Sequence, residues 1–410
     1  MSKLVHRRWE TDFGAFGGRK AKKGFSYDAY VPDLIAKQDF TLSAEVAHAV
    51  AQAGSLLGEV NRSGPTLGPL EVLARQLLRA ESVASSRIEG LQLSHRRLAR
   101  AAFSGDVSDI TAQSVLANIR AMELALATAA RSRRFGVPAI LKVHRTLFSA
   151  FGDPHAGKVR TEQNWIGGAA SSPRNAEFVP PPPELMLGLL EDLSEFMERD
   201  DLPPVMQAAI AHAQFETIHP FADGNGRVGR CLIHVVLTRR GVTPRVVPPI
   251  SLVLAAGSRA YVKGLTNFRA GGAHEWIELF ARATRTAALE ATRFSAQLAV
   301  LAGEWRARAA PLRKGSAANA LISLLPAAPI VDVQTAQELV GCSNQAARLA
   351  LAQLEKAGVI SKLTVGRRNR AWEAGAVFEL LNKLTPSPRP SHPQGRGRQF
   401  HYSGGGMKTA

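Results

Sequence analysis

Within twelve residues, the stretch from His219 to Arg230 collects the residue types that phosphate chemistry needs. It reads His-Pro-Phe-Ala-Asp-Gly-Asn-Gly-Arg-Val-Gly-Arg. Gly224 and Gly226 allow a positive φ and let the backbone approach a ligand closely. If a helix begins here, its free N–H groups and its positive dipole end face an anion. The stretch therefore predicts a phosphate-binding loop.

The side chains of the same stretch favour transfer chemistry. Arg227 and Arg230 are three positions apart, so both forks can reach the same phosphate groups. Asp223 supplies one hard oxygen ligand, which suits Mg²⁺ beside phosphates. His219 can take a proton from an attacking hydroxyl group.

The flanking segments predict the elements that position these residues. Residues 204–218 place apolar side chains at helical spacing, and residues 227–239 do so again before Gly241 supplies a stop. The stretch is thus a loop that opens directly into a helix N-terminus. Taken one at a time, its members have ordinary explanations: a helix-end histidine is usually a cap, Gly-Asn-Gly a turn and paired arginines a solvated face. Their combination favours phosphate.

A metal site is the alternative for the histidines of this region. His212, Glu216 and His219 fall on related helical positions. Their spacing differs from the His-Glu-x-x-His arrangement of zinc enzymes, so the phosphate site is favoured.

The stretch resembles the signature of the Fic family, His-x-Phe-x-(Asp/Glu)-Gly-Asn-Gly-Arg-x-x-Arg, without a mismatch. The resemblance continues upstream through residues 213–220. It includes residues 165–168 and 178–181, which look like the two sides of the family's flap hairpin. It covers about residues 30–300, and it implies a helical core with a short hairpin flap.

The resemblance implies a protein adenylyltransferase that uses ATP and Mg²⁺. It implies His219 as the catalytic base, Asp223 as the metal ligand and Arg230 as the clamp on the γ-phosphate, with Asn225 and Arg227 on the α- and β-phosphates. AMP would pass to a hydroxyl group of a target protein, and to the enzyme itself. The implied nucleotide-binding set is Gly224, Asn225, Gly226, Arg227 and Arg230, and the implied target-docking flap is Trp165, Ile166, Gly167, Phe178 and Val179.

In the family the flap aligns a target segment by strand-like pairing with its edge, a known mode of peptide recognition. Trp165 and Phe178, taken singly, fit an ordinary core equally well. Gly-Asn-Gly at the loop favours AMP transfer over phosphorylation, because the relatives that phosphorylate depart from it.

A helix predicted over residues 68–89 ends in a second point of resemblance. Ser85, Glu89 and Gly90 match the family's inhibitory motif, (Ser/Thr)-x-x-x-Glu-(Gly/Asn). This implies that Glu89 pairs with Arg230 and competes with phosphate for its fork. The alternative is an ordinary helix end, with Gly90 as its C′ residue and a surface carboxylate.

Composition bounds the class of protein. A length of 410 residues predicts two or three domains, and a net charge of +17 favours anionic partners. Two cysteines are too few for a disulfide framework, which fits a reducing cytosol. No apolar run is long enough for a bilayer, and no apolar segment of a signal peptide follows the basic N-terminus. A cytoplasmic protein is expected.

The predicted fold class is mainly α: a Fic helical core with a short β-hairpin flap, followed by a winged helix-turn-helix domain. Residues 1–25 are expected to be irregular. The predicted organisation is an N-terminal helical region over 1–110, the catalytic core over 111–302, a linker over 303–316, the winged helix over 317–384 and a disordered tail over 385–410.

Winged helices read DNA with one helix and with a basic wing, although some dock proteins instead. The candidate DNA contacts are Arg348, Arg367, Arg368 and Arg370. Two rival functions stay open. One is a DNA-binding regulator that uses the Fic core as a nucleotide sensor, and the other is an enzyme that removes AMP with the help of Glu89. The target protein and the oligomeric state, including a homo-oligomer, also stay open.

Overall fold

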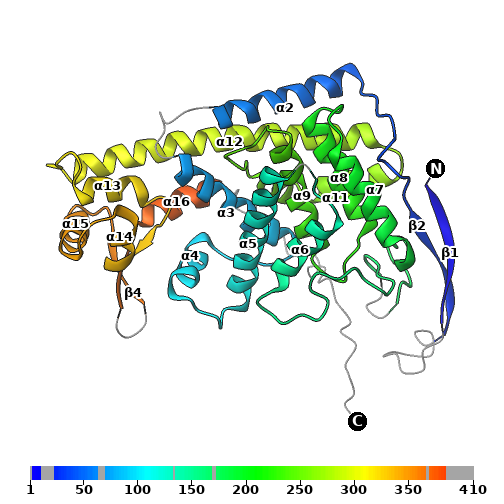
Figure 1. The fold of residues 1–410 in the computed structure, drawn as a ribbon, viewed down its shortest axis with the longest axis horizontal. Helices are drawn as coiled ribbons and strands as arrows, with labels where there is room; N and C mark the ends of the chain where they lie inside the picture. Colours follow the sequence, from blue (N-terminus) through cyan, green and yellow to red (C-terminus); the bar gives the residue numbers. More distant parts are fainter. Residues whose placement is uncertain are drawn as a thin grey trace, which may run out of the picture.

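The protein is mainly helical and elongated in this computed structural model, which describes residues 2–10, 23–62, 70–132, 134–168, 172–365 and 369–384. The long helix α12 (Ala273–Arg308) runs along much of its length. Strands β1 (Lys3–Trp9) and β2 (Phe25–Val31) lie at one end, and the C-terminal helices lie at the other (Figure 1). None of the described helices combines the length and apolar character needed to cross a bilayer.

The remaining elements follow in chain order. Before α12 these are α2 (Ala44–Arg62), α3 (Leu70–Ile88), α4 (His95–Ser104), α5 (Ile110–Arg131), α6 (Val137–Phe148), the 3₁₀ turn η2 (Pro183–Leu185), α7 (Met186–Glu198), α8 (Pro204–Ile218), α9 (Asn225–Arg239), α10 (Ile250–Ala256) and α11 (Ser258–Arg269). After it come α13 (Ala317–Leu324), β3 (Ile330–Val331), α14 (Val333–Val340), α15 (Asn344–Lys356), β4 (Ser361–Val365), β5 (Asn369–Glu373) and α16 (Gly375–Leu384).

Helices α8 and α9 form the centre of the core. Every residue from Val205 to Ile218 is buried, as is every residue from Asn225 to Thr238. A helix that is enclosed on all sides cannot shift without disturbing its neighbours. The loop between α8 and α9 is therefore held by two fixed ends.

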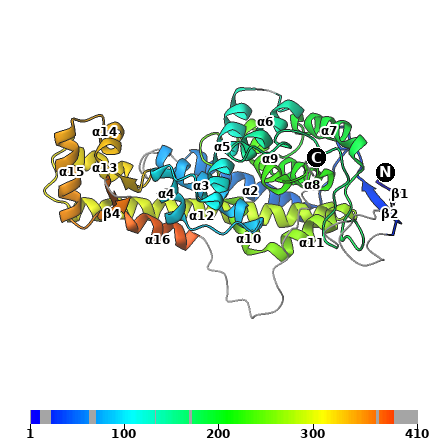
Figure 2. The ribbon, with the colours of Figure 1, turned by 90° about the horizontal axis from the view of Figure 1, so that it is seen from below.

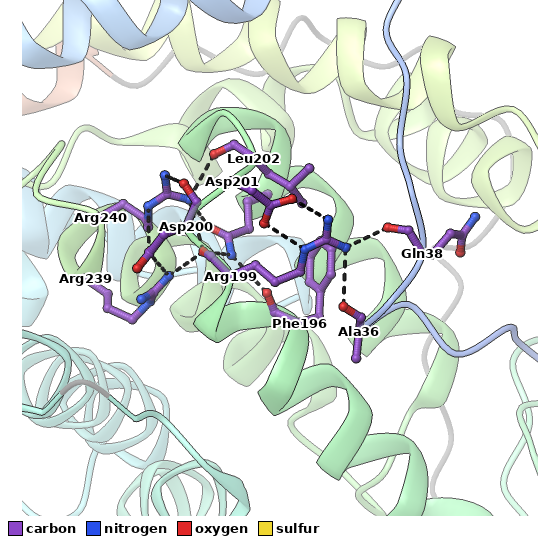
Figure 3. Close-up of polar contacts among 10 residues, drawn as sticks. Ala36, Gln38, Phe196, Arg199, Asp200, Asp201, Leu202, Arg239 and Arg240 are labelled. Atoms are coloured by element: carbon purple, nitrogen blue, oxygen red, sulfur yellow. Dashed lines mark hydrogen bonds and ion pairs between the residues drawn. The ribbon is translucent and has the colours of Figure 1, made fainter.

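An arginine network fixes the far end of α9 (Figure 3). Arg240 donates to the carbonyl oxygen of Leu202 at 2.9 Å and to that of Asp200 at 2.9 Å, both in the turn between α7 and α8. Arg239 donates to the carbonyl oxygen of Arg199 at 2.8 Å. These two guanidinium groups therefore tie the C-terminal end of α9 to the turn between α7 and α8.

Helix α3 is anchored along its length. Its Gln76 is buried and donates to the carbonyl oxygen of Pro326 at 2.5 Å. Its Glu81 is fully buried, contacts His234 of α9 at 2.9 Å and accepts from the backbone N–H of Ser251 of α10 at 2.7 Å. The helix is thus a core element that also touches the C-terminal segment.

The predicted linker over 303–316 is wrong in its first part. Residues 303–308 are the last turns of α12, and Trp305 is fully buried. The segment is rich in alanine and arginine, which are strong helix formers, and the tryptophan anchors the helix end. A helix of 36 residues results, about 54 Å long, with α2 packed beside it (Figure 1).

The prediction that residues 1–25 are irregular is wrong for residues 3–9, which form β1. Strands β1 and β2 pair antiparallel, from Lys3 opposite Val31 to Trp9 opposite Phe25. Aromatic and β-branched residues favour this ribbon, and Trp9 packs edge-on against Tyr27 with ring centroids 6.4 Å apart. Residues 11–22 lie outside the described part.

The C-terminal segment contains helices α13, α14 and α15 and a three-stranded antiparallel sheet in the order β3–β5–β4. Helix α16 runs beside α12 (Figure 2). Glu373 of β5 forms ion pairs with Arg96 at 3.3 Å and Arg100 at 3.1 Å, both on α4. A winged helix over 317–384 stays a prediction, and the tail over 385–410 lies outside the described residues.

Candidate active site

The loop between α8 and α9 depends on two left-handed backbone positions. His219 ends α8 with φ 50°, and Gly224 precedes α9 with φ 77°. A Cβ at Gly224 would lie 2.8 Å from the ring of Phe148. Only glycine fits this position, so the loop can turn tightly and present the first N–H groups of α9 outward.

Asn225 fastens the loop from inside. Its amide oxygen accepts from the backbone N–H of Phe221 at 2.9 Å, and its amide nitrogen donates to the Phe221 carbonyl oxygen at 2.8 Å. The residue is 2% exposed. Its side chain is therefore occupied by the loop, and its contribution to phosphate binding falls to the backbone N–H.

Replacing Asn225 by alanine should lower the free energy of unfolding by about 2 kcal/mol, because the buried N–H of Phe221 loses its acceptor and the Phe221 carbonyl oxygen keeps, among the described residues, only the donor from Asn164. Thermal or urea unfolding measures the change. Asn344→Ala is a suitable control, since its amide makes only exposed hydrogen bonds among the described residues, to Gln337 at 2.9 Å and from Arg348 at 2.7 Å, and its loss should cost less than about 0.5 kcal/mol. An equal effect of both variants would contradict the fastening role.

His144 of α6 is a site residue that the sequence reasoning missed. Its Nδ1 accepts from the backbone N–H of Gly157 at 2.8 Å, so its Nε2 carries the proton and donates to the Asp223 carbonyl oxygen at 3.0 Å. Its ring stacks on Phe221 with centroids 3.8 Å apart. Burial lowers its pKa to about 4, so the imidazole is neutral. A single histidine in an apolar helix gives no sequence signal for this role.

His219 has the properties of a base. Its Nδ1 is buried and has no hydrogen-bond partner among the described residues, and its carbonyl oxygen accepts from Arg160 Nε at 2.9 Å. Burial, followed by the positive charge of Arg160, lowers its pKa from 6.5 to about 4. The imidazole is therefore unprotonated at neutral pH and available to accept a proton.

The lowered pKa of His219 predicts an acid limit near pH 4. Because the neutral ring is the active form, activity controlled by this group should change by less than about twofold between pH 7.5 and 5.5, whereas an ordinary histidine would lose about tenfold. The unfolded chain takes up this proton near pH 6.5, so the shift also makes stability fall as pH drops from 6.5 toward 4. Initial transfer rates across this range measure the first effect, and a tenfold loss would contradict it.

Arg227 lies against the base of the loop. Its side chain is buried, donates to Ser114 Oγ at 3.0 Å and lies 5.2 Å from the centroid of the Phe148 ring. The Asp223 carboxylate is 3.8 Å from Arg227 and 43% exposed. Asp223 therefore faces solvent at the mouth of the loop, where a ligand can reach it.

Mg²⁺ fits this donor set. The described residues contain no group of three or more histidine, cysteine or carboxylate side chains that would hold a metal ion alone. Mg²⁺ usually binds through one or two carboxylates together with substrate phosphates, and Asp223 supplies one carboxylate. The alternative metal site of His212, Glu216 and His219 is not supported, because His212 Nε2 is already hydrogen-bonded to the Tyr261 hydroxyl at 2.8 Å.

Arg230 meets the end of α3. It is 1% exposed, and its Nε donates to Ser85 Oγ at 2.9 Å. Its Nη2 donates to the Ser85 carbonyl oxygen at 2.8 Å and to Glu89 Oε1 at 2.7 Å. Burial works to lower the pKa of Arg230, but Glu89, Tyr261 and Glu216 together outweigh it and the pKa is raised. A Cβ at Gly226 would overlap the Glu89 carboxylate, so this glycine makes the pair possible.

The two sides of the flap meet at one β-bridge, between Ile166 and Phe178. The Ile166 N–H donates to the Phe178 carbonyl oxygen at 2.8 Å. The Tyr30 N–H of β2 donates to the Val179 carbonyl oxygen at 2.9 Å, so β2 adjoins this side of the flap. Trp165 packs edge-on against Trp9 with centroids 5.5 Å apart. Residues 169–171 lie outside the described part.

Two family models match this region. Residues 135–237 match the Fic/DOC family, and residues 47–127 match the Fic/DOC family N-terminal region. The chain carries a Fic/DOC domain. The loop from His219 to Arg230 lies inside the Fic/DOC match, and Glu89 lies inside the N-terminal match.

Curated relatives of the Fic/DOC domain share a name. The chain is 34% identical over 112 residues to protein adenylyltransferase fic-1 of Caenorhabditis briggsae, which covers 27% of this chain and 20% of that protein. It is 33% identical over 112 residues to protein adenylyltransferase Fic of Drosophila willistoni, covering 27% of this chain and 21% of that protein. The chain thus spans about a fifth of the length of these relatives.

A solved structure shares the fold. A Fic family protein from Desulfovibrio desulfuricans G20 aligns with a TM-score of 0.50 and 21% identity, over 82% of this chain and 97% of that one. The alignment extends well beyond the Fic/DOC domain.

The structure brings together most of the predicted site residues. Arg230 contacts Ser85 and Glu89 at the end of α3, and Asp223 lies 3.8 Å from Arg227 at the start of the same helix α9. The two DNA candidates that the structure describes, Arg348 and Arg370, are not part of this site. Arg348 is exposed on α15 and bonds Asn344 at 2.7 Å, Arg370 is exposed on β5, and Arg367 and Arg368 lie outside the described residues. Their contact with DNA stays a prediction.

Proposed function

We propose that this protein is a protein adenylyltransferase that transfers AMP from ATP to a hydroxyl group of a target protein and of itself. The observation that carries the proposal is the neutral imidazole of His219, placed at the loop that opens α9. Arg227 and Arg230 follow on that helix. The names of the curated relatives support this class of reaction.

Each residue of the site has a separate role in the proposed reaction. His219 takes the proton of the target hydroxyl, whose oxygen forms a bond to the α-phosphorus of ATP. The bond from that phosphorus to the bridging oxygen of the β-phosphate breaks, and pyrophosphate leaves. The N–H groups of α9 and the Arg227 fork bind the phosphates, and Arg230 binds the γ-phosphate once Glu89 releases it. Most of the rate enhancement then comes from positioning and charge stabilisation.

Mg²⁺ held by Asp223 and the phosphates would supply additional neutralisation of charge. The exposed carboxylate of Asp223 fits that role.

Glu89 is proposed to restrain the enzyme. It bonds the Arg230 guanidinium, which the γ-phosphate would otherwise occupy. A carboxylate and a phosphate compete for the same donors, so ATP is bound poorly or in a wrong position while the pair persists.

The test compares label transfer from α-labelled and γ-labelled ATP, with Mg²⁺, in the Glu89→Gly variant. Label on protein from the α-phosphate but not from the γ-phosphate is the expected result. Label from the γ-phosphate alone would mean phosphorylation and would overturn the proposal. A folded variant that binds ATP but takes up neither label would also overturn it and favour the nucleotide-sensor alternative.

A further inference from the structure

Arg160 lies between α6 and the flap in the chain, and each of its three guanidinium nitrogens donates a hydrogen bond to a carbonyl oxygen. Nε donates to His219 at 2.9 Å, Nη1 to Glu162 at 2.9 Å and Nη2 to Pro181 at 2.5 Å. Its backbone N–H donates to the Pro220 carbonyl oxygen at 2.9 Å. The residue is 6% exposed. One buried side chain therefore joins the base, the start of the flap and the end of the flap.

This side chain is an unusual buried cation. Among the described residues it forms no ion pair within 4.0 Å, and burial lowers its pKa to about 10. A buried charge held only by neutral carbonyl groups is costly for stability. The contribution of Arg160 is therefore its three hydrogen bonds in fixed directions, and not an ion pair.

Two of the carbonyl groups that Arg160 binds belong to the catalytic loop and to the flap, and both segments depend on side-chain contacts for their conformation. His219 is a non-glycine residue at φ 50°, a conformation that costs about 1–3 kcal/mol and persists only when its surroundings enforce it. Asn164, close by, donates to the Phe221 carbonyl oxygen at 3.1 Å and to that of His219 at 3.4 Å. Gln163 donates to the Pro180 carbonyl oxygen at 2.9 Å. The turn after Arg160 thus braces both the catalytic loop and the flap.

We propose that Arg160 is a positioning residue that fixes His219 and the target-docking flap relative to each other. It touches neither the nucleotide phosphates nor the target hydroxyl, and acts through the His219 and Pro181 carbonyl groups. The proposal rests on the proposed function in one respect, which is that His219 is the base. The consequence is that a target hydroxyl aligned by the flap arrives at a fixed distance from the imidazole.

The positive charge of Arg160 also lowers the pKa of His219, and this effect can be separated from its hydrogen bonds by substitution. The groups facing His219 are Arg160 and Arg269, which oppose protonation, and Glu89 and the backbone of Glu216, which favour it. Removing the positive charge of Arg160 should therefore raise the pKa of His219 toward 6.5, whereas keeping the charge on a different side chain should not.

Two substitutions separate geometry from charge. Arg160→Lys keeps a cation but cannot donate in three fixed directions, whereas Arg160→Met removes both. In the Glu89→Gly background, Arg160→Lys should lower kcat for AMP transfer about 10- to 100-fold with little change in KM for ATP. Amide exchange at Ile166 and Phe178 should speed up in both variants. The His219 ring, followed by NMR in histidine-labelled protein, should titrate at higher pH only in Arg160→Met.

Arg240→Lys is the matched control. Arg240 also spreads its fork over carbonyl oxygens, but at the far end of α9, about 22 Å along the helix from Asn225 (Figure 3). Its replacement should lower the melting temperature without changing flap exchange or the His219 titration. If Arg240→Lys reproduced the Arg160→Lys pattern, the effect would be general destabilisation and the proposal would be overturned.

A milder variant covers the case in which the Arg160 variants do not fold. Asn164→Ala removes the second brace from a partly exposed position and should give the same pattern with a smaller amplitude. Wild-type flap exchange and wild-type kcat in Arg160→Lys, or in Asn164→Ala where that variant alone folds, would overturn the proposal. If flap exchange and the His219 titration respond as expected but no variant transfers AMP, the positioning role stands and the proposed function fails.

Discussion

Glycine at position 89 is expected to raise self-labelling from α-labelled ATP by about 10- to 100-fold. The carboxylate it removes bonds Arg230 Nη2 at 2.7 Å, in a site where Arg230 is 1% exposed. A hydrogen bond to a charged group contributes about 1.5–3 kcal/mol, which corresponds to roughly one to two powers of ten in phosphate binding. Labelling with α-labelled ATP and Mg²⁺, on wild type and variant side by side, measures the change.

The control for this prediction is Glu89→Gln, which keeps the shape of the side chain and one acceptor but loses the charge. It should give an intermediate increase, because a neutral amide competes less well with phosphate for the arginine. Affinity for ATP, measured by calorimetry, should rise in the same order. Equal labelling in wild type and both variants, with ATP bound by all three, would contradict the restraint by Glu89.

Alanine at position 219, introduced into the Glu89→Gly variant, is expected to reduce labelling by about 10²- to 10⁴-fold. The imidazole is the group placed to take the hydroxyl proton, and general base catalysis commonly contributes a factor of this size. Affinity for ATP should be little changed, because the proposed phosphate contacts come from α9. Rapid-quench measurement of label incorporation separates the chemical step from binding.

His274→Ala is the matched control for His219→Ala. Its ring lies on α12 and, among the described residues, hydrogen-bonds only the Thr41 carbonyl oxygen, at 2.7 Å, so its loss should leave labelling within about twofold of the parent. Unaltered labelling in the His219→Ala variant would show that another group removes the proton, and it would remove the central assignment of this site.

The part of the site that lies in one stretch of sequence could be predicted. His219, Asp223 and Arg230 share one loop and one helix, so residue type and spacing were enough to indicate phosphate binding. The Glu89–Arg230 pair joins residues 141 positions apart, and only the resemblance to the Fic family indicated it.

Arg160 and His144 could not be found in this way. Both act on backbone carbonyl groups, of His219 and of Asp223, which every residue type possesses. Such contacts leave no partner residue in the sequence to recognise. The residue type of Asn225 suits a phosphate contact, but its side-chain amide is occupied by the backbone of Phe221.

The fold could be predicted where periodicity is strong. The helices around the loop agree with their apolar spacing, with small shifts at the ends. The two wrong predictions, for residues 303–308 and for residues 3–9, rested on amino-acid composition and not on the spacing of apolar residues. The Arg-Ala run after residue 302 continues α12 because Trp305 is buried, and the charged N-terminus forms β1 because β2 supplies a partner. Tertiary contacts decided both cases.

Because α3 is anchored in the core, a loss of folding stability should not raise the resting activity of this enzyme. Gln76, Glu81 and Ser85 tie the helix to three other parts of the chain, so it cannot leave as a unit without exposing buried polar groups. A destabilised variant would therefore unfold before it switched on. Directed evolution for higher activity should accordingly find its changes in the last turn of α3 and at Glu89, and a screen for heat-sensitive variants should not recover activated ones.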